Sequence, residues 1–475
     1  MKRLLIAVTA MSLLVAGCGG TASDSTTSTS GEQETTTTAT QSESTTTATT
    51  GQDEIEELCA DAASSGVTGE VLCANYHSAA SSDVVDEPQV PAAEHQQFAC
   101  LYVPNQLIVF PALADGDAAA LGLAPIPTEE LVDGFGDYLE AVALGWYEMT
   151  TAGPTVLEKA AEVTQETGAL ASPHYVLAPA QGWKYGPGGE AVPVNGGWDD
   201  LEMGALAAGA RVVVIDTGGV ADTSSGKSPA APSLGVVSAV SESANLPGHL
   251  LGHGQFIASI INQYNPGLQI DIMNAGDGNG FVDEMGVIAA FQAAGLNGDE
   301  VVNLSLGTYP CTDDFPPLAL SVGTALMPHE LAGALDPPSN DPPITGTGVV
   351  AASGNDGETV QAPMYPARLG MDGAPYLLNV LADGVDFDSG LTAEIALAFG
   401  ENLASRVTAV GALTRPVAGA FAAGPADWSN QAEVYVPGTD VVGWYAPADS
   451  LAVWSGTSFA APRFAACLAS GHCSP

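Results

Sequence analysis

The sequence predicts an α/β protein in which a parallel sheet flanked by helices follows a small α+β domain. Runs of apolar, β-branched residues such as RVVVI at 211–215 are typical of strands that are buried on both faces. Helical patterns lie between these runs, and strands that alternate with helices favour a parallel sheet. Before about residue 198 the pattern is instead strand, helix, helix and strand, which indicates a separate α+β unit.

The first residues resemble an export signal. Lys2 and Arg3 precede an apolar run that is too short to span a membrane comfortably. Small residues directly before Cys18 resemble the bacterial lipobox, in which the cysteine carries the lipid and becomes the mature N-terminus. A plain secretory signal cut near Ala16 is the alternative. We therefore expect residues 1–18 to direct export, as a cell-envelope lipoprotein on the outer face of the membrane or a form released from it by processing.

The next segments carry few apolar residues. Residues 19–53 are nearly all Thr, Ser, Gln, Gly and Glu, so we expect a disordered tether. Such a tether has a root-mean-square reach of about 30 Å. Residues 54–97 are rich in Ala, Ser and Asp and contain cysteines, and we expect a small helical or irregular segment there.

Cysteine use fits an oxidising compartment. The chain has seven cysteines, and setting Cys18 aside leaves an even number, as expected if an exported protein pairs them in disulfides. Six cysteines allow fifteen pairings, so the pairing is a hypothesis only. The expected pairs are Cys59 with Cys73, Cys467 with Cys473, and Cys100 with Cys311.

Charge narrows the range of partners. The chain has 55 acidic and 10 basic side chains, a formal net charge of −45. A surface of this sign repels phosphate backbones and anionic headgroups, which argues against nucleic-acid binding. Contact with a membrane is therefore expected through the lipid at Cys18 alone.

The α+β unit spans residues 98–180. FACLYVPNQLIVF at 98–110 predicts two short strands around a Pro-Asn turn. TEELVDGFGDYLEAVALGW at 128–146 has a Thr cap, early acids and helical spacing. VLEKAAEVTQETGAL at 156–170 predicts a second helix that ends at a glycine, and HYVLAPA at 174–180 predicts a short extended piece.

A larger domain covers residues 198–475. Further buried strands are predicted at 268–275, 300–307 and 347–355, with helices at 252–264 and 284–295. Two segments, 309–345 and about 363–403, break the alternation and are interpreted as loops or insertions. In parallel sheets, functional groups gather where strands end and loops begin.

Polar residues stand at such ends. Asp216 follows the strand RVVVI, His253 lies between two glycines at a helix start, and Ser458 opens a helix near the C-terminus. Each has an ordinary structural explanation, since aspartate makes turns at strand ends and histidine and serine serve as helix caps. His249 is a competing histidine, but it lacks the flanking glycines.

In combination these residues resemble the subtilisin-like serine proteases. Asp216 in DTG, His253 in HG and Ser458 in GTSFAAP occur in the order of that family. SLG at 305–307 and SGN at 353–355 match its two intervening signatures. The resemblance implies a serine endopeptidase, a hydrolase that cleaves polypeptides through an acyl-enzyme intermediate.

The residue types fit that chemistry. A serine hydroxyl needs a neighbouring base to take its proton, and an imidazole with a pKa near 6.5 can do so at neutral pH. A carboxylate on the other ring nitrogen fixes the tautomer and stabilises the imidazolium. The resemblance therefore implies Ser458 as nucleophile, His253 as base and then acid, and Asp216 as the group that orients it. It also implies that Asn355 and the backbone N–H of Ser458 stabilise the oxyanion.

The resemblance assigns further contacts to substrate. Ser305, Leu306 and Gly307 match the segment that pairs with an extended substrate backbone, and such strand addition accepts many sequences. Ser353 and Gly354 are expected to line the pocket for the side chain before the cut. The preferred side chain cannot be named.

No cofactor is implied, and no metal ligand is assigned. GDGNGFVDE at 276–284 departs from an EF-hand loop, because Phe281 and Val282 occupy positions that need an oxygen ligand and a glycine. We interpret it as a loop and helix start. A structural calcium ion elsewhere is compatible with so many acids, at a site that the sequence does not reveal.

The α+β unit resembles the inhibitory propeptide of these proteases. YVPNQLIVF at 102–110 matches its opening strand, and SPHYVLAP at 172–179 matches the tail that enters the active site. This implies self-cleavage near residues 175–200. Two alternatives stay open. One is an inactive surface-anchored binding protein on the same fold, and the other keeps the chemistry but acts as an esterase or on one dedicated partner.

Overall fold

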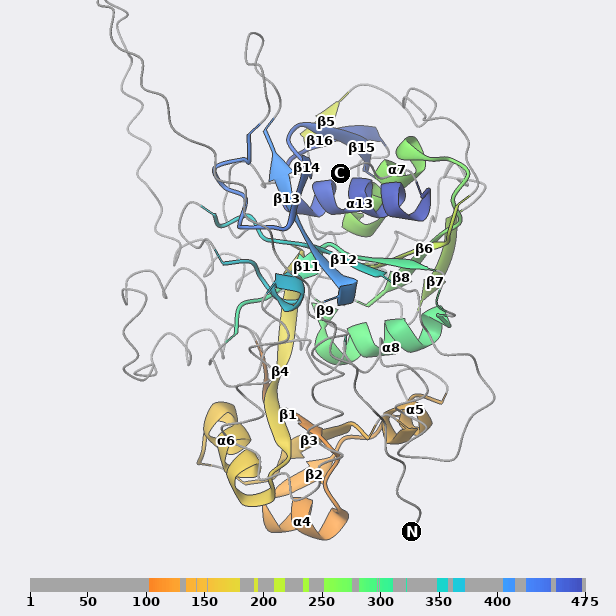
Figure 1. Cartoon of the computed structure of the whole chain (residues 1–475). Coiled ribbons are helices and arrows are strands. Elements are labelled where there is room, and N and C mark those ends of the chain that lie inside the picture. Colours follow the sequence, from red (N-terminus) through yellow and green to blue (C-terminus); the bar gives the residue numbers. More distant parts are fainter. Residues whose placement is uncertain are drawn as a thin grey trace, which may run out of the picture. The chain divides into compact units, whose positions relative to one another are not determined.

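The computed structural model describes much of the chain from Tyr102 to Gly471 (Figure 1). The described ranges, with short gaps inside 102–179 and 282–310, are 102–179, 192–194, 209–217, 234–238, 252–275, 282–310, 322, 348–357, 362–371, 405–414, 424–445 and 450–471. The expected signal at 1–18, the tether at 19–53 and the segment at 54–97 lie outside them. So does most of both expected insertions.

The N-terminal α+β domain is an antiparallel sheet with helices. Its elements are β1 (Tyr102–Phe110), α4 (Asp115–Ala120), β2 (Leu123–Pro125), α5 (Phe135–Ala141), β3 (Gly145–Met149), α6 (Val156–Thr167) and β4 (Leu170–Pro179). The strands lie in the order β4-β1-β3-β2. Helix α6 begins with a capping box between Thr155 and Glu158. It ends at Gly168 in the left-handed conformation, and this end at a glycine was predicted from the sequence.

Two local predictions in this domain are wrong. The predicted pair of short strands at 98–110 is one continuous strand, β1, because the Asn105 position at φ 60° is absorbed as an irregularity in the pairing with β4. The predicted helix at 128–146 is shorter in the described residues, and Gly145 and Trp146 belong to strand β3. Pairing of β3 with both β1 and β2 outweighs the helical spacing there.

The larger domain is built on a seven-stranded parallel sheet, which confirms the predicted fold class. Its spatial order is β14-β13-β12-β10-β6-β8-β7. The strands are β6 (Val212–Asp216), β7 (Leu234–Ser238), β8 (Ile270–Asn274), β10 (Val301–Leu304), β12 (Gly348–Ala352), β13 (Val407–Leu413) and β14 (Val434–Pro437). Every described pair is parallel. Strands β7, β13 and β14 were not predicted from the sequence.

Helices cover both faces of this sheet (Figure 1). Helices α7 (His253–Tyr264) and α13 (Thr457–Ala469) lie on one face and α8 (Glu284–Ala294) on the other. Each face has its own buried apolar cluster, one around Phe256 and Phe459 and one around Met285 and Phe291. Because both faces are covered, the strands are apolar on both sides.

Smaller elements complete the domain. Strands β5 (Val192–Val194), β15 (Val441–Tyr445) and β16 (Ser450–Trp454) form a three-stranded sheet in the order β15-β16-β5, and β16 leads directly into α13. The short strands β9 (Val282–Asp283) and β11 (Leu306–Gly307) both pair with β4 of the N-terminal domain. None of the helices in the described ranges is long and apolar enough to cross a membrane.

The strand order creates a switch point between β6 and β10. Strand β6 lies between β8 and β10, so the connections that follow it leave toward opposite edges of the sheet. Crevices that hold ligands form at the carboxyl ends of strands at such a point. Asp216 ends β6, and Ser305 follows β10 directly.

Candidate active site

Asp216 and His253 form a buried pair at this switch point. His253 Nδ1 lies 2.8 Å from Asp216 Oδ1, and both side chains are fully buried. The same carboxylate oxygen accepts a 2.7 Å hydrogen bond from the backbone N–H of Thr217. Because a carboxylate only accepts, Nδ1 of the neutral ring carries the proton, and Nε2 is left with a lone pair. This is the tautomer that a general base requires.

Aromatic rings fix the orientation of His253, which is the first residue of α7. The ring centroids of Trp454 and Phe459 each lie 5.4 Å from that of His253, and Trp454 meets it edge-on. These two residues come from β16 and α13. They were not predicted as part of the site, although both flank the GTS segment that was.

Ser458 is the second residue of α13 and is fully buried. Its hydroxyl donates to the backbone carbonyl of Ser305 at 3.1 Å. His253 Nε2 has no hydrogen-bond partner in the described part of the chain. The structure therefore brings together Asp216 and His253 but does not join Ser458 to His253 by a hydrogen bond.

Asn355 lies beside the start of α13. Its Oδ1 accepts from the backbone N–H of Thr457 at 2.8 Å and from the Thr457 hydroxyl at 3.0 Å. Because Oδ1 takes both of these donors, Nδ2 is the atom that faces Gly456, where an added Cβ would lie only 3.3 Å away. A larger residue at Gly456 would therefore crowd the Asn355 amide. The role of Thr457 in holding this amide was not predicted from the sequence.

The segment expected to bind substrate is already paired. Leu306 and Gly307 form β11, which pairs antiparallel with Pro179 and Ala178 of β4. Ser305, just before them, is fully buried and faces Ser458. The backbone edge of β11 is thus occupied by the N-terminal domain.

Ser353 and Gly354 are buried, and their assignment to a side-chain pocket stays a prediction. The Ser353 hydroxyl donates to the Asn430 carbonyl at 3.3 Å. The Asn430 amide in turn donates to the Tyr309 hydroxyl at 2.8 Å. Burial, together with the nearby Asp356 carboxylate, holds the pKa of Tyr309 well above its usual value, so its hydroxyl stays protonated. That hydroxyl lies 3.1 Å from Asp356 Oδ2.

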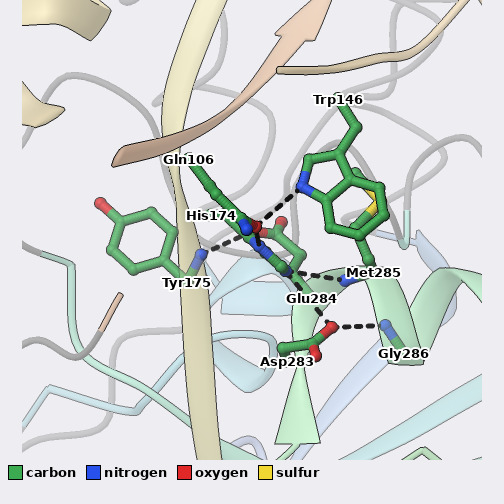
Figure 2. Close-up of polar contacts among 8 residues, drawn as sticks. All are labelled: Gln106, Trp146, His174, Tyr175, Asp283, Glu284, Met285 and Gly286. Atoms are coloured by element: carbon green, nitrogen blue, oxygen red, sulfur yellow. Dashed lines mark hydrogen bonds and ion pairs between the residues drawn. The ribbon is translucent and has the colours of Figure 1, made fainter. Parts of the chain in front are cut away.

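A second contact with the N-terminal domain centres on His174 (Figure 2). This buried side chain, on β4, places Nδ1 2.8 Å from Gln106 Oε1, which also accepts from the Trp146 indole at 3.1 Å. Its Nε2 lies 3.3 Å from Asp283 Oδ1 and 3.3 Å from the backbone nitrogen of Met285. The ring therefore contacts the first turn of α8.

The same first turn makes two further contacts. Asp283 caps α8 by accepting from the Gly286 N–H at 2.7 Å, which agrees with the predicted helix start. The buried Glu284 carboxylate accepts from the Tyr175 N–H of β4 at 3.4 Å. The N-terminal domain thus reaches the larger domain at both β11 and α8. The sequence contained no signal for the α8 contact, because its partners come from separate segments.

Several predicted sites cannot be compared with the structure. The lipidation site Cys18 lies outside the described residues, and so does a partner in each of the expected cysteine pairs. Residues 276–281 of the acidic loop also lie outside. Within the described ranges, no group of three or more His, Cys, Asp or Glu side chains could hold a metal ion.

Comparisons with known proteins place the chain in a family. No curated protein matches it. A cold adapted subtilisin-like serine proteinase of known structure is 19% identical, with 57% of this chain and 82% of that chain covered and a TM-score of 0.36. The structure of the prenylagaramide maturation protease PagA is 20% identical, with 57% and 75% covered and a TM-score of 0.33. The model of the subtilase family, Peptidase S8, matches residues 209–470, more than half of the chain. The chain therefore belongs to the subtilase family of serine peptidases.

Proposed function

We propose that this subtilase is an endopeptidase that cleaves polypeptides through Asp216, His253 and Ser458. The observation that carries the proposal is the fully buried hydrogen bond of 2.8 Å between His253 Nδ1 and Asp216 Oδ1. A buried histidine whose outer nitrogen has no partner is unusual, because buried polar atoms are normally satisfied. The lack of a partner for His253 Nε2 is explained if this nitrogen accepts a proton during the reaction.

The steps follow from these atoms. The Ser458 hydroxyl leaves the Ser305 carbonyl and turns toward His253 Nε2, which takes its proton as Oγ attacks the peptide carbonyl. The imidazolium formed is stabilised by the Asp216 carboxylate, and it then protonates the leaving amine. Water hydrolyses the acyl-enzyme by the same route in reverse.

Asn355 is proposed to stabilise the oxyanion together with the Ser458 N–H. Thr457 holds the oxygen of the Asn355 amide by two hydrogen bonds, and the amide nitrogen is the atom proposed to donate to the oxyanion. The Ser458 N–H lies in the first turn of α13, where the helix dipole favours negative charge. Ser353 and Gly354 would line the pocket for the side chain that precedes the cut.

The N-terminal domain is proposed to be an inhibitory propeptide. Its strand β4 pairs with Leu306 and Gly307, the segment that would bind an extended substrate backbone. A strand that occupies this edge excludes substrate. Self-cleavage near residues 175–200 would separate this strand from the catalytic domain, and dissociation of the domain would then free the edge.

We also propose that the protein is exported as a lipoprotein anchored at Cys18. The other cysteines are proposed to form disulfides. Cleavage near 175–200 would separate the catalytic domain from that anchor unless a disulfide or the contacts of β4 hold the two parts together. Mass spectrometry of the purified protein tests this order of events. An intact chain with full activity would refute maturation by self-cleavage.

A second candidate is an inactive binding protein on the same fold. It is favoured by one observation, namely that the buried Ser458 hydroxyl donates to Ser305 and not to His253. A fluorophosphonate probe decides between the two candidates, since it labels only an activated serine. We expect labelling and peptide hydrolysis in the processed protein and neither in Ser458→Ala. Equal labelling of both proteins, or none of either after processing, would refute the proposed function.

A further inference from the structure

We infer that Ser305 is a positioning residue for Ser458, and that Asn303 and Pro462 make this role possible. The inference rests on the proposed function of Ser458 as nucleophile. It assigns Ser305 a role through its side chain, which differs from backbone contact with substrate.

Two reciprocal hydrogen bonds join Ser305 and Ser458, which are 153 residues apart in the chain. The Ser305 hydroxyl donates to the Ser458 carbonyl at 2.9 Å, and the Ser458 hydroxyl donates to the Ser305 carbonyl at 3.1 Å. Both residues are fully buried. Only the second bond must break when the Ser458 hydroxyl turns toward His253. The first holds the backbone and therefore persists.

Pro462 explains why the Ser458 carbonyl is free to accept. In an α-helix this carbonyl would accept from the N–H four residues later, and that residue is Pro462, which lies inside α13 and has no N–H. The Ser305 hydroxyl takes the place of the missing donor. The spacing from Ser458 to Pro462 thus opens one acceptor on the nucleophile's own backbone.

Asn303 directs the proton of the Ser305 hydroxyl. Its Nδ2 donates to Ser305 Oγ at 2.9 Å, so the single hydroxyl proton is left for the Ser458 carbonyl. Asn303 is fully buried in β10 between the apolar residues Val302 and Leu304, and its own Oδ1 has no partner. A buried amide with an unsatisfied oxygen lowers stability. Its retention is explained if the Nδ2 donor serves Ser305.

The position of Ser305 in the chain determines what its hydrogen bond to Ser458 does. Leu306 and Gly307, the proposed substrate edge, follow it directly. Ser305 therefore fixes the nucleophile's backbone relative to the strand that would carry the substrate. Loss of its hydroxyl should leave backbone pairing at that edge intact but misplace the serine, which lowers kcat more than it raises KM.

The test expresses the full-length chain and measures activity once self-cleavage is complete. We expect Ser305→Ala to lower kcat for a fluorogenic peptide by about 10- to 100-fold, with KM changed by less than about 3-fold. The rate of fluorophosphonate labelling should fall by the same factor as kcat. Asn303→Leu keeps the volume and removes the unsatisfied amide, so we expect an unchanged or higher Tm with kcat lowered about 3- to 10-fold.

Ser259→Ala is the matched control. Ser259 is also fully buried, and its hydroxyl donates to the Phe256 carbonyl at 2.7 Å and accepts from the Trp444 N–H at 2.9 Å, but it forms no hydrogen bond with Ser458 in the described part of the chain. We expect a loss of Tm similar to that of Ser305→Ala, with kcat within about 2-fold of wild type. Equal loss of kcat in the two variants would mean that Ser305 contributes only to the stability of the fold, and it would overturn the inference.

A rescue experiment distinguishes two roles of the Ser305 hydroxyl, namely positioning Ser458 and supplying a hydrogen-bond donor to the Ser458 carbonyl. In Ser305→Ala, the further change Pro462→Ala supplies a helical N–H to the Ser458 carbonyl. A positioning role predicts recovery of Tm without recovery of kcat, whereas recovery of both would overturn it. If wild type labels at Ser458 and Ser305→Ala labels at the same rate, this inference alone fails. If wild type itself does not label, the proposed function fails.

Discussion

Replacement of His174 by alanine should weaken the hold of the N-terminal domain on the catalytic domain. The change removes the contacts of His174 Nε2 with the Met285 backbone nitrogen and with Asp283 Oδ1, each at 3.3 Å. It also removes the edge-on packing against Trp146 at a centroid distance of 5.5 Å. The β4 pairing with β9 and β11 does not involve the His174 side chain and should remain.

The magnitude follows from one lost hydrogen bond. The Met285 N–H also bonds to the Asp283 carboxylate, so it keeps an acceptor when the His174 ring is removed. Loss of one hydrogen bond across the contact costs about 0.5–1.5 kcal/mol, which corresponds to about 2- to 13-fold weaker binding of the domain.

The assay follows activity on dilution of the processed protein, in which the cut N-terminal domain is proposed to act as a non-covalent inhibitor. The concentration at which half the activity appears should rise by about 2- to 13-fold in His174→Ala. Glu166→Ala, an exposed change on α6 of the same domain, is the control and should match wild type. A His174→Ala protein whose dilution curve overlays that of the control would refute the reasoning, provided that thermal unfolding shows the domain still folded.

Three further predictions concern the same structure. Asn355→Ala should lower kcat by about 10²- to 10³-fold with little change in KM, because one oxyanion donor is lost, and steady-state kinetics measure this. Gly354→Ala should lower Tm in a melting experiment, because φ is 111° and the new Cβ would lie 2.9 Å from Met364 Cγ. At Asp283, burial raises the pKa, but hydrogen bonding and charge from His174 and the backbone N–H groups of α8 outweigh it, so the net pKa is lowered. A lowered pKa stabilises the folded form only while the acid is ionised, so this contribution is present above the ordinary value of 3.8 and is lost as the pH falls through the lowered one. The free energy of unfolding, measured between pH 6 and pH 2, should therefore fall less steeply with falling pH in Asp283→Asn than in wild type, because the variant has no carboxylate to titrate at this position.

Much of the fold could be predicted from local patterns. Apolar β-branched runs predicted β6, β8, β10 and β12 because strands buried on both faces need no alternation. Strands β7 and β14 were missed at the edges of the sheet, and β13 was missed although it has seven residues inside the sheet. The first two residues of β3, Gly145 and Trp146, were taken for helix, because pairing with its two neighbours in the sheet decides the conformation there.

The sequence by itself predicted which residues the candidate site contains. Asp216, His253, Ser458 and Asn355 each stand beside an element end, and their motifs, in this order, resemble those of the subtilase family, which implies the chemistry. Chemistry restricts residue type strongly, so short motifs carry this information locally.

Only the tertiary structure decided how these groups are held. The bond from Ser305 to Ser458 joins residues 153 positions apart, and the contact between His174 and Met285 joins residues 111 apart. Neither pair has a local pattern, because a serine or histidine looks the same in sequence whether its partner is water or a distant backbone group. Packing of β10 against α13, and of β4 against α8, creates these contacts, and packing depends on the whole chain at once.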